Sequence, residues 1–382
     1  MSKLSDLQAV QQILARLVSF NTVSSNPNRA LIDYVRSLLD GFGVASEIIA
    51  GEADGKACLW ATIGEGDSGI LLAGHTDVVP VTGQNWSSDP FLLTERNETL
   101  IGRGAADMKG FIACALAFIP EFLAAKPRGC FHLALTCDEE TTMSGAMRLT
   151  DMLVARGFKP QWVWIGEPTG LSIVDQHKGV AVYRTRFSGI PHHSSQPDKG
   201  VSAIESAGDF MQLLREAAQK KKAHPFAPSR FDPPFTTFNL GKIEGGNAAN
   251  IIAETCELLW EVRTHPGDAA NEIMTDIGTQ ARDVAARGPL ETCTCYDIPP
   301  FLATTHNLGT DTLKRLLKCD QTHAVGFATE GGIYQKLGVG AIVCGPGFID
   351  QAHQPNEYIE KNQLTACVDL MRAVLLSSSA RE

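Results

Sequence analysis

The sequence lacks the features that define several classes of protein. Its 10 cysteines are scattered over 382 residues, and no two of them are spaced as CxxC. Zinc ribbons and disulfide frameworks are therefore not expected. No apolar run reaches the roughly 18 residues of a membrane-spanning helix, and the amphipathic amino-terminal segment has no signal-peptide core. We expect a cytoplasmic protein with reduced thiols and no membrane partner.

Positive charge is also scarce. The chain has 43 Asp and Glu residues but only 33 Lys and Arg residues, a formal net charge of -10. Such an excess repels phosphate backbones, so a nucleic-acid partner is not expected. The basic run 220–222 is interpreted as the solvated end of a helix. The length and the 44% hydrophobic content fit a globular protein of two or three domains.

Short apolar runs alternate with helical patterns in the first half of the chain. Buried strands are predicted at 69–73, 130–136 and 162–165, and helices at 28–41, 111–122 and 145–155. Strands buried on both faces alternating with helices predict an α/β domain with helices on both faces of a mixed sheet. The same pattern returns after about residue 295, with a helix at 308–317, a strand at 340–344 and a carboxy-terminal helix.

The pattern differs between these two parts. Half-exposed strands are predicted at 180–187, 236–243 and 255–262, and helices at 203–218 and 269–285. This order is typical of a small α+β, ferredoxin-like sandwich. We therefore predict a discontinuous catalytic domain, residues 1–179 and 294–382, with a second domain, residues 180–293, inserted into it.

Side chains of the kinds that bind metals cluster where the predicted buried strands end. The candidates are His75 and Asp77 after the strand at 69–73, Glu139 and Glu140 after that at 130–136, Glu167 after that at 162–165, and His353 after that at 340–344. A further candidate, Asp107, stands in a glycine-rich segment directly before a helix. Folds of this class place their sites in loops at the carboxyl ends of strands.

Each of these segments also has a simpler interpretation. Asp107 could cap the helix, His75 and Asp77 could form a buried polar pair, and the acidic triplet 138–140 could be a solvated turn. Taken together, however, the segments supply two histidines and at least three carboxylates, the ligand set of two divalent ions sharing a carboxylate. Adjacent carboxylates beside an apolar strand repel one another unless a cation neutralises them.

Six motifs resemble those of the M20 metallopeptidases and occur in the order found in that family. They are GHTDVVP, GRGAADMKG, DEETTMSG, GEPT, HHSSQPDKGVSAI and AHQPNEY. The resemblance covers essentially the whole chain and is closest to the acetylornithine deacetylases. It implies two divalent metal ions per chain, Zn²⁺ or Co²⁺, in a zinc-peptidase-like catalytic domain. It also implies that the inserted domain forms a homodimer.

The resemblance also implies a role for each site residue. One metal would be bound by His75 and Glu167, the other by Glu140 and His353, and both by Asp107. Asp77 would support His75, and Glu139 would be the general base and proton shuttle. His193, or its neighbour His192, would reach the partner subunit's active site and stabilise the oxyanion.

The implied substrate is a small N-acyl amino acid, N2-acetyl-L-ornithine, cleaved to L-ornithine and acetate in arginine biosynthesis. Asn250 and Arg263 match positions that bind the substrate carboxylate or the tetrahedral oxygen, although ordinary sheet polarity would also place them there. Glu330 is a candidate partner for the substrate's side-chain ammonium. Alternatively, it caps a helix that begins near Gly331.

Two other functions remain open from the sequence. The chain could be another M20 hydrolase, such as a succinyl-diaminopimelate desuccinylase, an N-acetylcitrulline deacetylase or a dipeptidase. The Thr329-Glu330-Gly331 segment favours the acetylornithine branch, whereas the second glycine after Glu330 departs from it. The chain could also be a non-catalytic, metal-stabilised binding protein, but Glu139 argues against this because holding metal does not require it.

Overall fold

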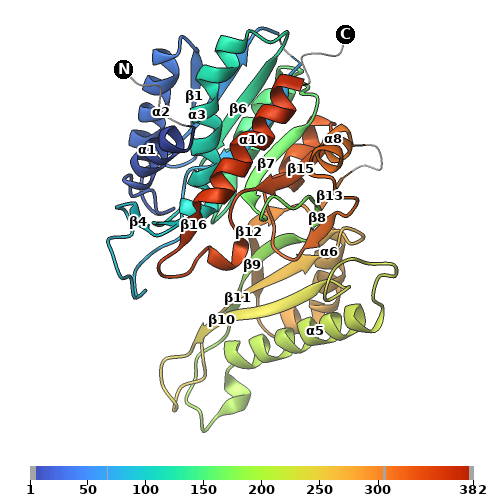
Figure 1. Ribbon diagram of the computed structural model, residues 1–382. Coiled ribbons are helices and arrows are strands. Elements are labelled where there is room, and N and C mark those ends of the chain that lie inside the picture. The colour runs from blue at the N-terminus through green and yellow to red at the C-terminus, as the bar shows by residue number, and fades with distance from the viewer. Residues whose placement is uncertain (1–5, 67, 304–306, 378–382) are drawn as a thin grey trace. The chain divides into compact units, whose positions relative to one another are not determined.

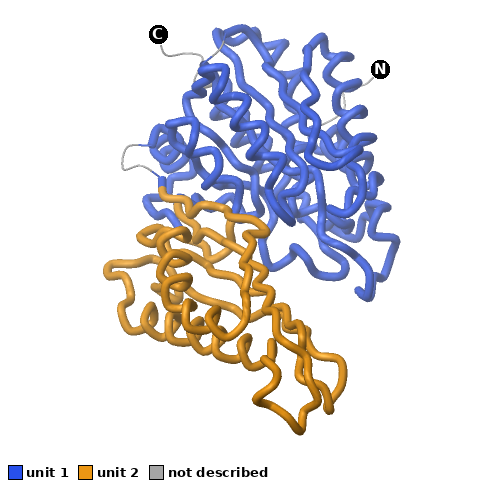
Figure 2. The backbone as a smooth tube through the Cα atoms, turned by 180° about the vertical axis from the view of Figure 1, so that it is seen from behind, with its two compact units in different colours: residues 1–175, 303–323, 329–382 blue, residues 176–302, 324–328 orange. Residues whose placement is uncertain are grey.

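The chain divides into two units. The computed structural model describes residues 6–66, 68–303 and 307–377. Unit 1 consists of Met1–Asp175, Ala303–His323 and Thr329–Glu382, and unit 2 of Gln176–Leu302 and Ala324–Ala328 (Figure 2). The segment 180–293, expected from the sequence to form the inserted domain, lies within unit 2.

Unit 1 forms the predicted α/β domain and also contains elements that were not predicted, among them strands at 46–50 and 57–64. Its helices are α1 (Asp6–Val18), α2 (Arg29–Gly41), α3 (Gly110–Ala125), α4 (Ser144–Ala155), α8 (Leu308–Leu317), α9 (Gly331–Tyr334) and α10 (Lys361–Ser377). Its main strands are β1 (Ser46–Ala50), β2 (Ala57–Gly64), β3 (Ile70–His75), β6 (Cys130–Thr136), β7 (Val163–Pro168) and β15 (Ala341–Gly345). A smaller sheet contains β4 (Thr94–Arg96), β5 (Thr99–Ile101) and β16 (Tyr358–Glu360).

The large sheet is mixed, as the sequence predicts. Its strand order is β1-β2-β6-β3-β7-β15 and continues through β8 (Val174–His177) to β13 (Phe301–Leu302), with β14 (His323–Val325) beside β8. The strands β6, β3, β7 and β15 run parallel to one another, whereas β1 and β2 are antiparallel to their neighbours. Four carboxyl ends therefore meet at one edge of the sheet.

Helices cover both faces of this sheet. Ile70 and Leu72 of β3 belong to the same hydrophobic cluster as the apolar residues of α3 and α10, which lie side by side in Figure 1. Leu71 and Ala73 point to the opposite face and are buried as well. The strand is therefore apolar along its whole length, which explains the unbroken run in the sequence.

Helix α3 corrects one expectation from composition. Residues 105–125 are apolar and long enough to meet the criteria for a membrane span, although no such run was expected. In the structure 67% of the most apolar part of this stretch is buried, and Phe111, Phe118 and Phe122 are each about 1% exposed. A helix that is buried on most sides in the core of a protein is as apolar as a membrane-spanning helix.

Unit 2 is a four-stranded antiparallel sheet with helices. Its elements are β9 (Gly179–Ser188), α5 (Ala203–Ala223), β10 (Thr237–Gly245), β11 (Thr255–Thr264), α6 (Ala270–Gln280), α7 (Arg282–Arg287) and β12 (Leu290–Ile298). The strand order β10-β11-β9-β12 with this sequence of elements is ferredoxin-like. Buried side chains of the sheet and helices, including Phe210 and Trp260, form its own core.

The four-stranded part of unit 2 differs from the prediction at one helix and one strand. The helix predicted at 269–285 is two helices, because α6 ends at Gln280 and α7 begins at Arg282. The strand β12 was not predicted. Its sequence, LETCTCYDI, is mostly exposed and polar, so it lacks the alternation of apolar residues that identifies a half-buried strand.

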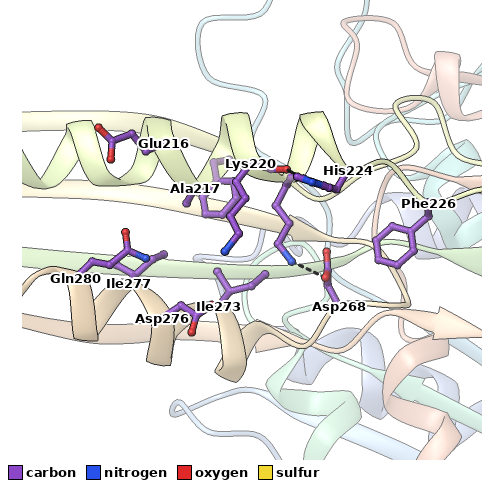
Figure 3. A pocket seen from close by; sticks show the side chains of 12 residues that line it. Glu216, Ala217, Lys220, His224, Phe226, Asp268, Ile273, Asp276, Ile277 and Gln280 are labelled. Atoms are coloured by element: carbon purple, nitrogen blue, oxygen red, sulfur yellow. Dashed lines mark hydrogen bonds and ion pairs between the residues drawn. The ribbon is translucent and has the colours of Figure 1, made fainter.

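The basic run at the end of α5 borders a cavity that we call the charged cavity. It has a volume of about 450 Å³ and lies between α5 and α6 (Figure 3). Across it, Lys221 Nζ lies 2.6 Å from Asp268 Oδ1. The second oxygen of Asp268 accepts a hydrogen bond from Thr236. The run is thus a helix end in which one lysine is paired.

Candidate metal centre

The parallel strands bring four candidate ligands to one edge of the sheet. His75 is the last residue of β3, and Glu167 lies near the end of β7. Glu139 and Glu140 follow β6 in a turn that begins at Asp138, whose positive φ of 63° bends the chain directly after the strand. The carboxylate of Asp138 pairs with Lys56 at 2.7 Å and takes no part in the cluster.

Asp107 lies between the two histidines. Its Oδ1 is 3.0 Å from His75 Nε2, and its Oδ2 is 3.4 Å from His353 Nε2. Asp107 belongs to the short π-helical turn Ala105–Lys109, which precedes α3 and in which its backbone is not helical. A carboxylate that offers one oxygen to each side has the arrangement of a bridging ligand.

The remaining contacts complete two overlapping groups. His353 Nε2 is 3.1 Å from Glu140 Oε1, and His75 Nε2 is 3.7 Å from Glu167 Oε1 and 4.0 Å from Glu139 Oε2. Among the described residues, two sets of ligand atoms lie within 4.8 Å of one another: His75 with Asp107 and Glu140, and His75 with Glu139 and Glu167. Glu139 is thus close enough to be a ligand as well as a base.

The cluster holds more buried negative charge than its own side chains balance. Burial raises the pKa of Glu139, Glu140 and Glu167. Hydrogen bonds to Asp107 and Glu140 raise the pKa of His353 to about 10. In addition, Glu167 Oε1 is buried without a hydrogen-bond partner among the residues described. Imidazoles and surplus carboxylates of this kind fit divalent metal ions, which would neutralise them.

Asp77 supports the centre in a different way from the one expected. The ring Nδ1–H of His75 donates to the backbone carbonyl of Asp77 at 3.0 Å, whereas the nearer carboxylate oxygen is 3.8 Å away. The carboxylate accepts the backbone N–H groups of Glu139 at 3.1 Å and Glu140 at 3.3 Å. Asp77 therefore fixes the acidic turn, and its carbonyl leaves His75 Nε2 directed at the cluster.

Glu330 lies beneath the centre rather than at its surface. It is 1% exposed, and its Oε1 accepts a hydrogen bond from Thr136, the last residue of β6, at 2.5 Å. Its Oε2 has no partner among the described residues, and burial raises the pKa of its carboxyl to about 7. Glu330 stands before α9, but its side chain makes no capping hydrogen bond.

The other candidates belong to unit 2. His193 is exposed, and its Nδ1 is 2.7 Å from Ser195 Oγ. Its neighbour Ser194 donates a backbone hydrogen bond to Asn250, so the structure brings these two loops together. Arg263, near the carboxyl end of β11, pairs with Glu261 at 3.2 Å.

One supporting residue had no role assigned from the sequence. Glu357, the glutamate of the AHQPNEY motif, is 1% exposed. Its carboxylate accepts the backbone N–H groups of Gly104, Ala106 and Asp107 at 2.9–3.0 Å. The motif was a signal that this position matters, but its partners lie about 250 positions earlier in the chain.

Comparisons with known proteins identify the family of this chain. A family model described as peptidase family M20/M25/M40 matches residues 71–377. An acetylornithine deacetylase of Vibrio campbellii is 34% identical over 381 residues, 97% of this chain and 98% of that protein. One of Pectobacterium carotovorum is 37% identical over 346 residues, 88% of this chain and 86% of that protein.

Solved structures share the fold at much lower identity. A tripeptidase from Staphylococcus aureus has a TM-score of 0.77 at 18% identity and covers 98% of this chain and 99% of that chain. A dinuclear metal-binding peptidase of the M20 family from Bacillus subtilis has a TM-score of 0.66 at 14% identity, with the same coverage. The predicted fold class is confirmed. The chain belongs to peptidase family M20/M25/M40 and is a metal-dependent hydrolase.

Proposed function

We propose that this chain is a cytoplasmic, dinuclear amidohydrolase of arginine biosynthesis that removes the acetyl group from N2-acetyl-L-ornithine, giving L-ornithine and acetate. The observation that carries the proposal is the convergence of two imidazoles and buried carboxylates at one sheet edge, with Asp107 between the imidazoles. The names of the relatives, which are similar over almost their whole length, supply the substrate.

The residues are assigned to two ions, zinc or cobalt. One would be held by His75 and Glu167, the other by Glu140 and His353, with Asp107 shared. Bound there, the ions would supply the positive charge that polarises the acyl carbonyl and makes water more acidic. Asp77 would keep the acidic turn in place through its hydrogen bonds to the backbone.

Glu139 is proposed as the general base. Its Oε2 lies 4.0 Å from His75 Nε2, and its side chain is 9% exposed, so a carboxylate oxygen can face a water inside the cluster. It would accept the proton of the attacking water and later give that proton to the nitrogen of the leaving amine. Because Glu140 supplies a ligand next to it, two adjacent carboxylates would serve different purposes.

Unit 2 is proposed to form a homodimer. Its strand β10 is largely exposed and stands at the edge of its sheet among the described residues, so its outer side offers backbone groups to a second copy. Ile190 and Ile251, close in sequence to His193 and Asn250, are 57% and 46% exposed. In the dimer, His193 of one chain would donate a hydrogen bond to the oxyanion in the partner's centre. His192, half-buried, remains the alternative donor.

Substrate selection is proposed to depend on charge at both ends of the molecule. Arg263 would bind the substrate carboxylate through two parallel hydrogen bonds, exchanging its present pairing with Glu261. Asn250 would assist through its amide. Glu330, whose Oε2 has no partner among the described residues, would stabilise the side-chain ammonium.

A single assay tests the proposed reaction. Amine release is measured on N-acetylornithine, N-acetylcitrulline, N-acetylmethionine, N-succinyl-diaminopimelate and a dipeptide, before and after exhaustive chelation. We expect the highest kcat/KM on N-acetylornithine, full loss with chelator, and recovery with Zn²⁺ or Co²⁺. A higher kcat/KM on another substrate of the panel would show that the proposed substrate is wrong. Activity that survives chelation would refute the metal centre.

A further inference from the structure

His353 is the most exposed of the proposed ligands. Its side chain is 49% exposed, and its backbone has a positive φ of 61° in the loop after β15. Its ring Nε2 lies 3.1 Å from Glu140 Oε1 and 3.4 Å from Asp107 Oδ2. A ligand on such a turn needs its backbone held if the ring is to stay in place without metal. The side-chain amide of Gln84 meets this need by donating to the His353 carbonyl at 2.9 Å.

The orientation of the Gln84 amide is fixed by its other partners. Gln84 Oε1 accepts hydrogen bonds from Arg103 Nη2 at 2.5 Å and from Trp86 Nε1 at 3.0 Å. Arginine and the indole nitrogen can only donate. The amide oxygen must therefore face them, and the NH₂ group must face the His353 carbonyl. Arg103 itself is 1% exposed, and its Cζ lies over the ring of Trp86, 5.1 Å from the ring centroid.

Arg103 links Gln84 to the loop of the second ligand. Its Nη1 donates to Glu357 Oε2 at 2.7 Å. The other oxygen of Glu357 accepts the backbone N–H groups of Ala106 and Asp107. Because the backbone at Asp107 is not helical (φ −119°, ψ 94°), the carboxylate supplies acceptors for buried N–H groups of this turn.

We propose that Gln84, Arg103 and Glu357 form a positioning network that fixes Asp107 and His353 relative to each other, and so sets the affinity of the metal position that both of them bind. The proposal rests on the metal centre of the proposed function. The network reaches the ligands through backbone hydrogen bonds. It does not include His75 or Glu167, so it acts on one metal position more than on the other.

Gln84 is the position at which to test the network. It is only half-buried, whereas Arg103 and Glu357 form a fully buried ion pair whose loss would destabilise the fold. Gln84→Glu keeps an acceptor for Arg103 and Trp86 but has no donor for the His353 carbonyl. Gln84→Ala removes both the acceptor for Arg103 and Trp86 and the donor for the His353 carbonyl. Asn85→Asp is the matched control, because it adds the same charge at an exposed neighbour with no side-chain hydrogen bond among the described residues.

The metal-free proteins are titrated with Co²⁺ and followed by visible absorption, and thermal unfolding is recorded without metal. We expect the wild type and Asn85→Asp to bind two equivalents alike. We expect Gln84→Glu and Gln84→Ala to bind one equivalent about 10- to 100-fold more weakly, the usual effect of losing a group that orients a ligand. Added negative charge alone would strengthen cation binding, so a weaker affinity in Gln84→Glu reports on the lost donor.

Three results have distinct meanings. Cobalt affinities of Gln84→Glu equal to those of the wild type would overturn the network and leave the metal centre intact. Equal weakening of both equivalents, with a lower metal-free melting temperature, would make Gln84 a general structural residue and also overturn the proposal. A wild type that binds no cobalt would refute the metal centre itself, and with it the network.

Discussion

The metal centre of unit 1 and the charged cavity of unit 2 both gather acidic and basic side chains, but those side chains differ in how far they are exposed to solvent. In the cavity, Lys221 lies 2.6 Å from Asp268, and the two side chains are 31% and 11% exposed. In the centre, His75 and Glu167 are 1% and 4% exposed. Burial there raises the pKa of Glu139, Glu140 and Glu167, each of which has other acids close by.

This difference shows which cluster depends on a ligand. A partly exposed ion pair is stable alone and contributes little to folding. Several carboxylates gathered in a buried site repel one another unless a cation joins them. We therefore interpret the centre as a site whose free energy depends on bound metal, and the cavity as ordinary surface structure.

The largest effect is expected at Glu139. Glu139→Gln should lower kcat on N-acetylornithine by at least about 100-fold, because it removes the proton acceptor. Metal content should stay at the wild-type level, since the proposed ligands remain. Metal analysis of the purified variant, together with steady-state kinetics, measures both quantities.

Glu140→Gln is the matched control for this prediction. It makes the same chemical change one residue later, but it alters a group that contacts His353 at 3.1 Å. We expect this variant to lose metal as well as activity. If Glu139→Gln lost metal while Glu140→Gln retained it, the roles of the two neighbours would be reversed, as their proximity to His75 permits.

How far the sequence could predict the centre depends on the kind of interaction. His75, Glu139 and Glu167 were found because they end buried strands, and the apolar runs of those strands are visible in one sequence. The parallel order of the strands then brings their ends together. The same reasoning gave the long helices of both units and the strands β3, β6, β7, β9, β10, β11 and β15. It missed β1, β2 and the short strands, and also β12, whose residues are too polar to show a period.

The hydrogen bonds that support the ligands could not be predicted from a pattern in the sequence. Gln84 and His353 are 269 positions apart, and their hydrogen bond joins a side chain to a backbone carbonyl. The carboxylate of Asp77 likewise binds backbone N–H groups, which any residue type provides. The burial of Glu330 was also hidden, because an acid before two glycines is equally typical of an exposed helix start. Backbone partners become visible only once the chain is folded.

The second effect concerns His193, through which unit 2 would contribute to the centre of a partner chain. His193→Ala should lower kcat by roughly 100- to 1,000-fold, the usual effect of losing one oxyanion donor. Mixing it with inactive Glu139→Ala after subunit exchange should restore about a quarter of wild-type activity, since half of the dimers are hybrids with one complete site. A protein that sediments as a monomer under assay conditions and is fully active would contradict the proposed homodimer.

The third effect tests Glu330, an acid that shares the burial of the centre but lies beneath it. Glu330→Gln should lower kcat/KM for N-acetylornithine more than for N-acetylmethionine, which has no side-chain ammonium. A hydrogen bond to a charged group is worth about 1.5–3 kcal/mol, so the ratio should change by about 10- to 150-fold. Equal losses on both substrates would assign Glu330 to supporting Thr136 at the end of β6 instead.

The smallest effect is expected in the charged cavity. Lys221→Met keeps the apolar stem and removes the charge, and it should lower the free energy of unfolding by about 0.2–1 kcal/mol, because exposed pairs contribute little. Asp268 would retain its hydrogen bond from Thr236, so no buried charge is left without a partner.

Lys220→Met is the control, since Lys220 lines the same cavity without an ion pair among the described residues. The difference between the two variants in chemical denaturation isolates the pair. Cobalt affinity and kcat should be unchanged in both. A loss above about 2 kcal/mol in the free energy of unfolding, or a change in metal binding, would show that the cavity is not independent of the rest of the fold. The comparison between the cavity and the centre would then no longer identify which site requires a cation.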